Sequence, residues 1–154
     1  LEQVNVVMRE QIKQLEKVML TLVNALMPEL LEVKGIGVVL AATLLAEAGD
    51  VRRFRSQHAF AMFAGCAPVE RSSGGCQRRQ LNIGGNRRLN RAFHMLAIIR
   101  LRLDDDTKAY IAKKKAEAKT LRAALRCLKT HLARAIFRVM HTTLNAHPER
   151  GVTS

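Results

Sequence analysis

A heptad pattern of apolar residues opens the chain and restricts its first segment to one long helix. The pattern combines two series with a period of seven: Leu1, Met8, Leu15 and Leu22, and Asn5, Ile12, Met19 and Leu26. Steps that alternate between four and three residues are typical of a coiled-coil seam. We therefore predict a coiled-coil helix over residues 1–29 that joins two copies of the chain. The alternative is a single amphipathic helix that packs on its own domain.

Helical spacing continues through the second half of the chain. Residues 87–102 predict a helix whose inward side chains are Leu89, Phe93, Leu96, Ala97 and Ile99. Thr120 opens a last helix, whose apolar stripe is Leu121, Leu125, Leu128, Leu132, Ile136 and Val139. Aromatic residues make up only 4% of the chain and Trp is absent, so aliphatic side chains must build the core. This composition suits packed helices, and we predict an all-α fold.

A glycine-containing turn separates two of the expected helices. Gly35 and Gly37 bracket Ile36, and Gly49 has the position of a helix C-cap. The pattern predicts a helix-hairpin-helix over residues 30–49, in which free backbone amides of the turn hold a DNA phosphate without reading a base. The candidate contacts are Lys34, Gly35 and Gly37. A plain turn between helices remains the alternative.

The remaining boundaries come from capping residues. Ser56 is expected to cap a short helix that ends at Phe63, and Asn86 to cap the helix from residue 87. Residues 65–86 between them are expected to form a loop. Asp104 to Asp106 are interpreted as a solvated turn and helix cap. We therefore expect a helical domain over residues 30–145 and a frayed tail over residues 146–154.

Charge is distributed unevenly along the chain. The formal net charge is +13; residues 1–50 contribute −3 and residues 51–154 contribute +16. Such a basic segment favours a polyanionic partner, since each phosphate that Lys or Arg neutralises releases a counterion. Nucleic acid is the preferred interpretation. A solvated basic surface, an acidic protein and a membrane surface are the alternatives.

A serine pair lies within the most arginine-rich part of the chain. Between Arg52 and Arg91 the sequence has nine arginines and one acid, Glu70, and Ser72 and Ser73 precede two glycines. Arginine grips phosphate oxygens with two parallel hydrogen bonds, so a serine nucleophile for phosphodiester chemistry is one interpretation. A flexible loop that only contacts DNA is the other. His58 and His94 are candidate bases by position only.

The three cysteines, Cys66, Cys76 and Cys127, form no CxxC pair. An odd number of cysteines without such a pair favours free thiols in a reducing compartment. A zinc site from Cys66, Cys76 and a histidine is the alternative, although its spacing matches no common ligand pattern. We expect neither a signal peptide nor a membrane span, because no apolar run has the required length.

Three segments in succession resemble a known family. They are "LLEVKGIGVVLAATLLAEAGDVRRFRSQHAFAMFAGCAPVERSSGG", "RRQLNIGGNRRLNRAFHMLAIIRLR" and "AYIAKKKAEAKTLRAALRCLKTHLARAIFRVM". Together they resemble the C-terminal domain of bacterial transposases of the insertion-sequence 110/116/902 group, which is related to Piv-type DNA invertases. The resemblance covers residues 30–140, and the heptad helix is similar to the coiled coil that precedes this domain in the family.

The resemblance implies half of a composite active site for DNA strand cleavage and rejoining. Its serine would be Ser73, which directly precedes the glycine, with Ser72 in reserve. The nucleic-acid contacts it implies are Arg78, Arg79, Arg87, Arg88 and Arg91. Arg71, just before the serines, is a further candidate contact. No cofactor is expected in this chain, because the family's DEDD carboxylates and their divalent metal (Mg²⁺) belong to an N-terminal RuvC-like domain that this sequence lacks.

Further expectations follow from the same resemblance. The partners would be DNA, a guide (bridge) RNA and a second copy of the chain, in the cytoplasm at the bacterial nucleoid. The 154 residues alone would bind nucleic acid but would not recombine it. The alternative is a nucleic-acid-binding and dimerisation module without chemistry of its own.

Overall fold

Six α-helices build the body of the chain. The computed structural model describes the backbone of residues 1–73, 76–80 and 85–151, with side chains for all of these except residues 69–73 and 76–80. The helices are α1 (Glu2–Leu26), α2 (Val38–Ala48), α3 (Gln57–Phe63), α4 (Arg87–Leu103), α5 (Asp105–Ala116) and α6 (Leu121–Ala146). The 3-10 helices η1 (Pro28–Glu32) and η2 (Val51–Arg53) lie between α1 and α2 and between α2 and α3, and a third, η3 (Pro148–Arg150), follows α6. The predicted all-α class is confirmed.

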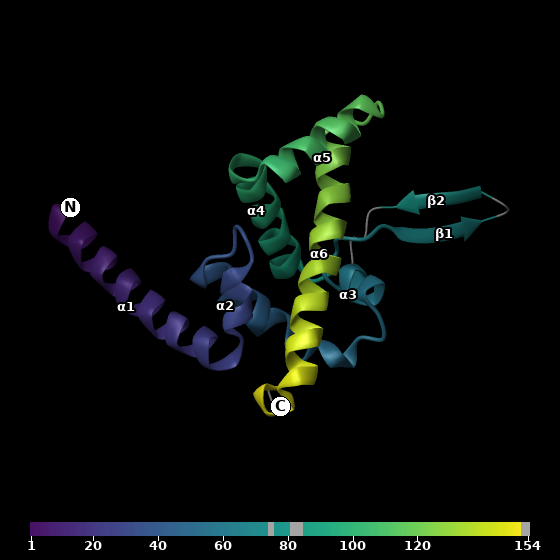
Figure 1. Cartoon of the computed structure of the whole chain (residues 1–154). Helices are drawn as coiled ribbons and strands as arrows, with labels where there is room; N and C mark the ends of the chain where they lie inside the picture. The colour runs from purple at the N-terminus through teal and green to yellow at the C-terminus, as the bar shows by residue number, and fades with distance from the viewer. Residues whose placement is uncertain (74–75, 81–84, 152–154) are drawn as a thin grey trace.

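The segment that was expected to be a loop contains a β-hairpin. Strands β1 (Val69–Ser73) and β2 (Cys76–Gln80) pair antiparallel and project from the helical body beside α6 (Figure 1). The sequence carries a signal for this hairpin, because two glycines between two short polar runs favour a two-residue β-turn. The helical periodicity on both sides obscured that signal.

Helix α6 forms the centre of the body. Helices α3, α4 and α5 pack against it, α2 packs against α4, and α1 leads away from α2 (Figure 1). The buried face of α6 consists of Ala124, Leu128, Leu132, Ala133, Ile136, Phe137, Met140, Thr143 and Leu144. This face includes the centre of the predicted apolar stripe, whereas Leu121 at the start of α6 is 44% exposed.

All five phenylalanines of the chain meet around Phe60. The Phe60 side chain is fully buried, and its ring centroid lies 6.2 Å from that of Phe93 on α4 and 5.6 Å from that of Phe137 on α6. Phe54 contacts both Phe60 and Phe63. Edge and tilted ring pairs at these distances stabilise a core beyond the area that they bury. The aromatic cluster therefore joins α3, α4 and α6.

Local capping predictions are confirmed. The Ser56 hydroxyl accepts a hydrogen bond from the amide of Ala59 (3.1 Å), and the Thr120 hydroxyl accepts one from the amide of Ala123 (3.1 Å). Gly49, with a φ of 61°, ends α2. Each hydroxyl satisfies an amide that has no partner within its helix, which is why these residues mark helix starts.

Asp104 corrects the interpretation of residues 104–106 as a solvated turn. It caps α5 as expected, but it is buried, whereas Asp105 and Asp106 are exposed. Its carboxylate accepts hydrogen bonds from the Thr107 hydroxyl (2.6 Å) and from the Lys34 ammonium (3.1 Å). These two hydrogen bonds hold the pKa of Asp104 down at about 2. Asp104 therefore ties the turn before α2 to the junction of α4 and α5.

The hairpin leaves the body where two backbone segments touch. Gly65 follows α3 and Gly85 precedes α4, and a Cβ atom built on Gly85 would lie 2.3 Å from the Cα atom of Gly65. No side chain fits that space, and Gly65 also has a φ of 70°. Glycine is therefore required at both positions if the two ends of the hairpin are to meet.

Hydrogen bonds fasten this crossing to the helices. The amide of Asn86 donates to the carbonyl of Phe63 (2.7 Å), and the side-chain amide of Asn90 donates to the carbonyl of Gly65 (3.3 Å). From α6, Lys129 donates to Asn90 and Thr130 donates to the carbonyl of Cys66. Residues from α3, α4 and α6 thus fix the base of the hairpin.

The charge of Asp104 is expected to stabilise the fold at neutral pH. Asp104→Asn keeps a capping side chain but removes the charge, so its melting temperature should fall several degrees below that of the wild type at pH 7. Because the folded pKa is lowered, this contribution exists above the unfolded pKa near 4 and is lost as the pH falls toward 2. The difference between variant and wild type should therefore vanish near pH 2, as measured by thermal melts.

The exposed Asp106→Asn is the matched control, because it removes a charge from the same turn of α5 without a buried ion pair. Its melting temperature at pH 7 should fall much less than that of Asp104→Asn, since only the weak interaction with the helix dipole is lost. Equal melting temperatures for wild type and Asp104→Asn at pH 7 would contradict the role of the Asp104 charge.

A methyl group at the glycine crossing is expected to destabilise the fold. Gly85→Ala forces a Cβ atom into the backbone of Gly65, and overpacking of this kind costs about 1–3 kcal/mol. Urea denaturation followed by circular dichroism measures this loss. Gly151→Ala is the control, because its new Cβ atom meets chiefly the guanidinium end of Arg52, which can move. An unchanged urea midpoint for Gly85→Ala would contradict the close crossing.

Candidate nucleic-acid interface and serine hairpin

The serine pair lies at the far end of strand β1. The pairing register is Val69 with Gln80, Glu70 with Arg79, Arg71 with Arg78, Ser72 with Gln77, and Ser73 with Cys76. Ser73 is therefore the last paired residue before Gly74 and Gly75, which lie outside the described residues. At about 3.3 Å per residue, Ser73 is about 13 Å along the strand from Val69.

The register assigns the two serines to opposite faces of the hairpin. Alternate residues of a strand share a face, and directly paired residues share the same face. One face therefore holds the positions of Val69, Arg71, Ser73, Cys76, Arg78 and Gln80, and the other those of Glu70, Ser72, Gln77 and Arg79. Ser73 shares its face with two arginine positions and no acid. Ser72 shares its face with one arginine and the glutamate that pairs with it.

The side chains of these predicted site residues lie outside the described part of the chain: Arg71, Ser72, Ser73, Arg78 and Arg79. The hairpin register places them relative to one another along the backbone, and the glycine crossing places the base of the hairpin.

The arginines at the start of α4 are exposed. Arg87 and Arg91 have no ion-pair partner among the described residues, whereas Arg88 donates to the Glu47 carboxylate (3.1 Å). Glu47 also accepts from Asn86 (3.1 Å), and these two hydrogen bonds lower the pKa of Glu47. Since the Arg88 side chain is 81% exposed, its ion pair with Glu47 does not cover it.

The predicted helix-hairpin-helix region has a 3-10 helix, η1, before its glycine turn and α2 after it. Gly35 has a φ of 92° and packs on α4, where a Cβ atom would lie 3.1 Å from Leu96 and from Arg100. Gly37 begins α2 without a capping side chain, and nothing lies within 4 Å of its Cβ position. Gly35 thus shapes the turn, and Gly37 leaves its amide end open.

Lys34 forms part of the same turn. Its ammonium pairs with Asp104, but its side chain is 56% exposed. The structure therefore gives Lys34 a role in holding the turn on α4, in addition to the phosphate contact that the sequence predicts.

The cysteine and histidine candidates differ in burial, and among the described residues they form no metal site. Burial raises the pKa of the Cys66 thiol to about 12, so this sulfur stays protonated at neutral pH. His58 is exposed with its Nδ1 atom 3.2 Å from Arg134, and His94 is also exposed. Within the described ranges, no three His, Cys, Asp or Glu side chains gather as a metal site would require.

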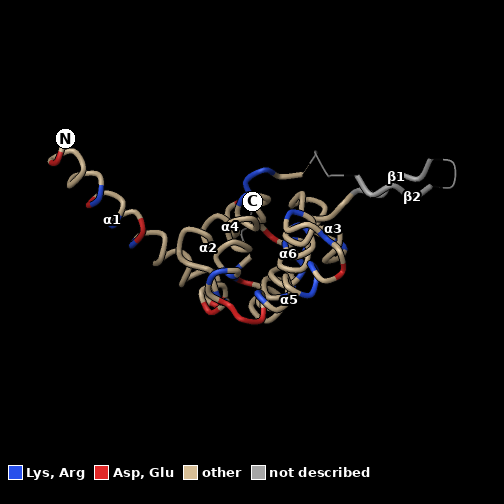
Figure 2. The backbone as a smooth tube through the Cα atoms, turned by 90° about the horizontal axis from the view of Figure 1, so that it is seen from above, with Lys and Arg blue, Asp and Glu red and all other residues tan. Residues whose placement is uncertain are grey.

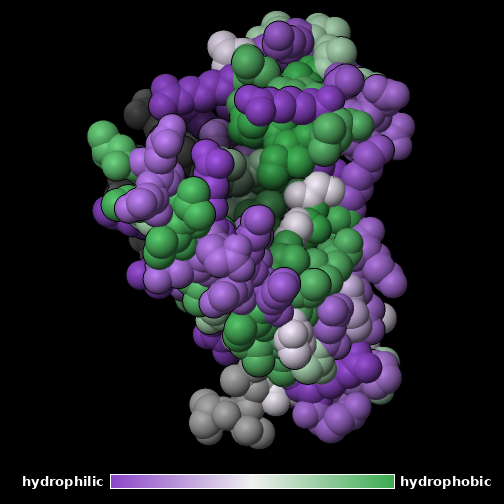
Figure 3. Space-filling model, turned by 90° about the vertical axis from the view of Figure 1, so that its left-hand side faces the viewer, coloured by the Kyte–Doolittle hydropathy of each residue, from purple (hydrophilic) through white to green (hydrophobic). Residues whose placement is uncertain are grey.

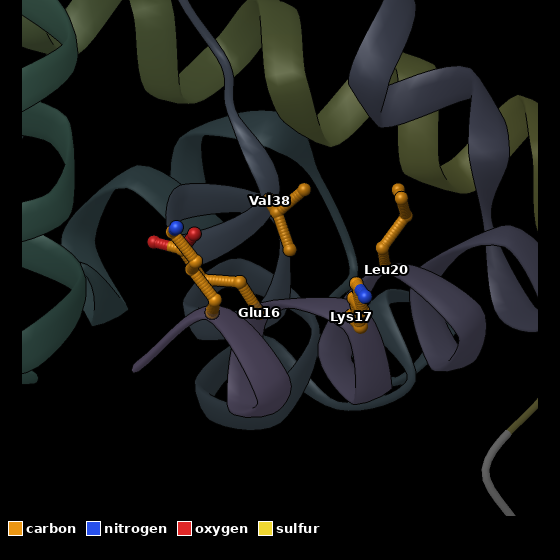
Figure 4. Close-up of a pocket in the computed structure, with 5 residues that line it drawn as sticks. Glu16, Lys17, Leu20 and Val38 are labelled. Carbon is orange, nitrogen blue, oxygen red and sulfur yellow. The ribbon is translucent and has the colours of Figure 1, made fainter. Parts of the chain in front are cut away.

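A shallow hollow between α1 and α2 is lined by Lys13, Glu16, Lys17, Leu20 and Val38 (Figure 4). It is open to solvent and combines aliphatic groups with charges of both signs. Its charged residues, Lys13, Glu16 and Lys17, lie on the exposed surface of α1, and we assign no catalytic role to the hollow. Across the part of the chain that the structure describes, no helix has the length and apolarity needed to cross a membrane.

Sequence reasoning missed the residues that anchor the hairpin: Asn90, Lys129 and Thr130. Asn90 and Lys129 are 39 positions apart, and Thr130 is 64 positions from Cys66. Hydrogen bonds over such separations leave no local pattern in the sequence. The sequence does contain Gly65 and Gly85, but that these glycines allow a close backbone crossing is evident only from the fold.

Similarity to known proteins is consistent with these features. The sequence matches the transposase IS116/IS110/IS902 family over residues 27–112. It is 35% identical over 119 residues to the insertion element IS110 uncharacterized 43.6 kDa protein of Streptomyces coelicolor, an alignment that covers 75% of this chain and 29% of that protein. It is 31% identical over 128 residues to the insertion element IS900 uncharacterized 42 kDa protein of Mycobacterium paratuberculosis, covering 77% and 30% respectively.

A third relative matches a shorter region. The probable family 20 transposase of Pseudomonas aeruginosa is 44% identical over 55 residues, which are 36% of this chain and 16% of that protein. The chain thus spans less than a third of the length of each of these relatives. Since the family match covers more than half of the 154 residues, the chain belongs to the transposase IS116/IS110/IS902 family.

Proposed function

We propose that this chain is the part of a transposase that binds DNA and supplies the serine nucleophile for strand cleavage and rejoining. The observation that carries the proposal is the hairpin register, which places Ser73 at the tip of the hairpin on the same face as Arg71 and Arg78. Family membership supports a transposase-related role. The covalent step below is our inference from this arrangement.

In the proposed reaction, the Ser73 oxygen attacks a DNA phosphorus atom. The serine hydroxyl gives up its proton as a bond forms between Oγ and phosphorus. One phosphorus–oxygen bond of the DNA backbone breaks, and the oxygen of the freed strand end takes up a proton and leaves as a hydroxyl. The phosphoserine link conserves the energy of the broken bond. Attack by the hydroxyl of a second strand reverses these changes and releases the serine.

The arginine pair suits the charge that develops in this step. Arg71 and Arg78 are direct cross-strand partners, and like charges in that arrangement destabilise an unliganded hairpin. A phosphate beside both positions would remove the repulsion and receive bidentate hydrogen bonds. Ser73 is two residues from Arg71 on the same face, so this anion would lie next to the proposed nucleophile.

The other partners extend the proposal. Exposed Arg87 and Arg91 and the open amide end at Gly37 would hold neighbouring DNA phosphates. The resemblance also implies a guide RNA, action in the bacterial cytoplasm and a RuvC-like domain that holds a divalent metal. Because the described residues form no metal site, we assign no step to a metal in this chain, and we expect the chain alone to bind DNA without recombining it.

Ser73→Ala in a full-length transposase that contains this chain tests the nucleophile. The variant should lose covalent protein–DNA adducts by at least about a thousandfold, because removing a nucleophile leaves no group to form the link. Adducts are measured on denaturing gels with labelled DNA. Ser72→Ala is the matched control and should retain adducts, since Ser72 lies on the opposite face of the hairpin.

Adducts that persist in Ser73→Ala would overturn the assignment. If they disappear only in Ser72→Ala, the serine in reserve is the nucleophile and the argument from the register is wrong. If strand cleavage continues in both variants, the chain is a binding module without chemistry of its own.

Helix α1 supports a second part of the proposal, a homodimer. Nine large apolar side chains of α1 are exposed, as is Leu1 just before the helix. Of the predicted seam, the exposed residues are Leu1, Met8, Ile12, Leu15 and Leu22. Val23 is the one residue of α1 that is buried against the body. Figure 3, which views the side from which α1 projects, shows hydrophobic side chains at the surface among hydrophilic ones. A second α1 helix would cover the seam.

Sedimentation of the 154-residue chain tests the dimer. The double variant Ile12→Gln and Leu15→Gln should raise the dimer dissociation constant at least about a hundredfold, because each apolar side chain contributes about 1.5 kcal/mol or more when buried. The control is Val6→Gln with Val18→Gln, which removes two exposed apolar side chains outside the seam. A monomeric wild type, or equal effects of both variants, would contradict the coiled coil.

A further inference from the structure

Four cations lie in succession at the start of α6, and we call them the α6 basic stripe: Lys119, Arg122, Arg126 and Lys129. The first three are exposed and Lys129 is half-buried. Figure 2 shows Lys and Arg along α5 and α6. The three residues of α6 are spaced by four and three positions, so they share one face of the helix. The stripe ends at Lys129, at the base of the serine hairpin.

The two halves of α6 use their arginines differently. In the second half, Arg134 contacts His58, and Arg138 donates to Gln57 (2.8 Å). In the first half, the guanidinium groups of Arg122 and Arg126 have neither an ion pair nor a hydrogen bond to any described residue. The second-half arginines therefore hold α3 on α6, whereas Arg122 and Arg126 make no such polar contact with the described residues. Lys119 of the stripe donates to the Sγ atom of Cys127 (3.5 Å).

The position of the stripe disfavours a purely structural role. Cations near a helix N-terminus oppose the helix dipole, and the first turn of α6 has Arg122 but no acid. Arg122 and Arg126 repel each other as like charges four positions apart. Burial lowers the pKa of Lys129, and the nearby charge of Arg126 lowers it further. By contrast, Lys113 to Lys115 lie at the C-terminus of α5, where the helix dipole favours them.

An anionic backbone would offset this repulsion. Arg122 to Lys129 spans about 10 Å along the helix, since each residue rises 1.5 Å. One strand of a duplex presents a phosphate about every 3.4 Å of its axis, so about three phosphates match the stripe. The nearby aromatic side chain, Tyr110, stacks on His131 at 6.1 Å and has Lys114 5.6 Å from its ring. Its ring is thus occupied, which favours backbone contact over base stacking.

We propose that the α6 basic stripe is a second nucleic-acid surface, which binds the sugar-phosphate backbone of a duplex and leads it to the base of the serine hairpin. The proposal rests on the proposed function for its nucleic-acid substrate but not for the chemistry of Ser73. Lys129 ends the surface, because its ammonium already donates to Asn90. DNA and guide RNA duplexes share the backbone chemistry that the stripe recognises.

The salt dependence of binding tests the stripe. The triple variant Lys119→Gln, Arg122→Gln and Arg126→Gln is compared with the wild-type 154-residue chain on DNA and RNA duplexes of equal length. The slope of log K against log salt is negative, and each lost phosphate contact makes it shallower by about 0.9. The magnitude of the slope should therefore decrease by about 2.7 in the triple variant. Affinity at 0.1 M salt should weaken by about tenfold to a hundredfold. Circular dichroism checks that the variant keeps its helices.

The matched control neutralises Arg9, Lys13 and Lys17 of α1, which removes the same net charge from exposed helical positions outside the seam. This control should keep a slope close to that of the wild type. Equal slopes for stripe variant and wild type, or equal losses in stripe and control variants, would overturn the proposal. A loss on both duplexes supports it, and a loss on one duplex supports it and identifies DNA or RNA as the partner.

These outcomes are independent of the test of Ser73. The stripe variant is judged by equilibrium binding of duplexes, whereas the nucleophile is judged by covalent adducts. If the stripe variant has a shallower salt slope but no covalent adducts form with any protein, wild type included, the binding surface is supported and the serine chemistry is rejected. If the stripe variant keeps the wild-type slope while adducts depend on Ser73, the serine chemistry is supported and the binding surface is rejected.

Discussion

The burial of Phe60 between α4 and α6 determines where the serine hairpin leaves the body. Its ring packs on Phe93 and Phe137 and so fixes α3, which ends three residues later at Phe63. The hairpin begins just beyond α3 and returns just before α4, so both of its ends depend on this packing. The Gly65–Gly85 crossing then brings the two ends together at backbone distance. The proposed nucleophile on the hairpin, Ser73, thus takes its position from the core.

Acidic residues organise the basic surface. Asp104 pairs with Lys34, and Glu47 pairs with Arg88 and with the cap residue Asn86. Both acids lie at helix junctions and hold cations that the sequence assigns to nucleic acid. Each of these cations stays more than half exposed, so it can hold the fold and face a phosphate at the same time. A structural role and the proposed binding role are therefore compatible for Lys34 and Arg88.

Features of the fold that depend on short-range interactions, such as the helix starts, could be predicted from the sequence. Ser56, Asn86 and Thr120 start helices because their side chains accept hydrogen bonds two or three residues away, and that chemistry is visible in the sequence. The burial of Asp104 depends on Lys34, which is 70 positions away, so the local sequence predicts a solvated acidic turn where the fold has a buried carboxylate. The β-hairpin was missed although Gly74 and Gly75 marked it. The register, which separates Ser72 from Ser73, could be obtained only from the paired strands.

In the proposed function, the hairpin presents the nucleophile away from the helical body, and the α6 basic stripe on that body binds the duplex. Ser73 stands about 13 Å beyond the start of β1, so it is presented away from the helices rather than within a pocket of its own domain. A serine in that position can meet groups that a second domain supplies, which fits a chain that spans less than a third of its relatives' length. In the proposed reaction, other residues of this chain would hold the duplex. Exposed cations on α4 and α6, on helices fixed by the Phe60 core, are suited to that task because their spacing does not depend on the hairpin.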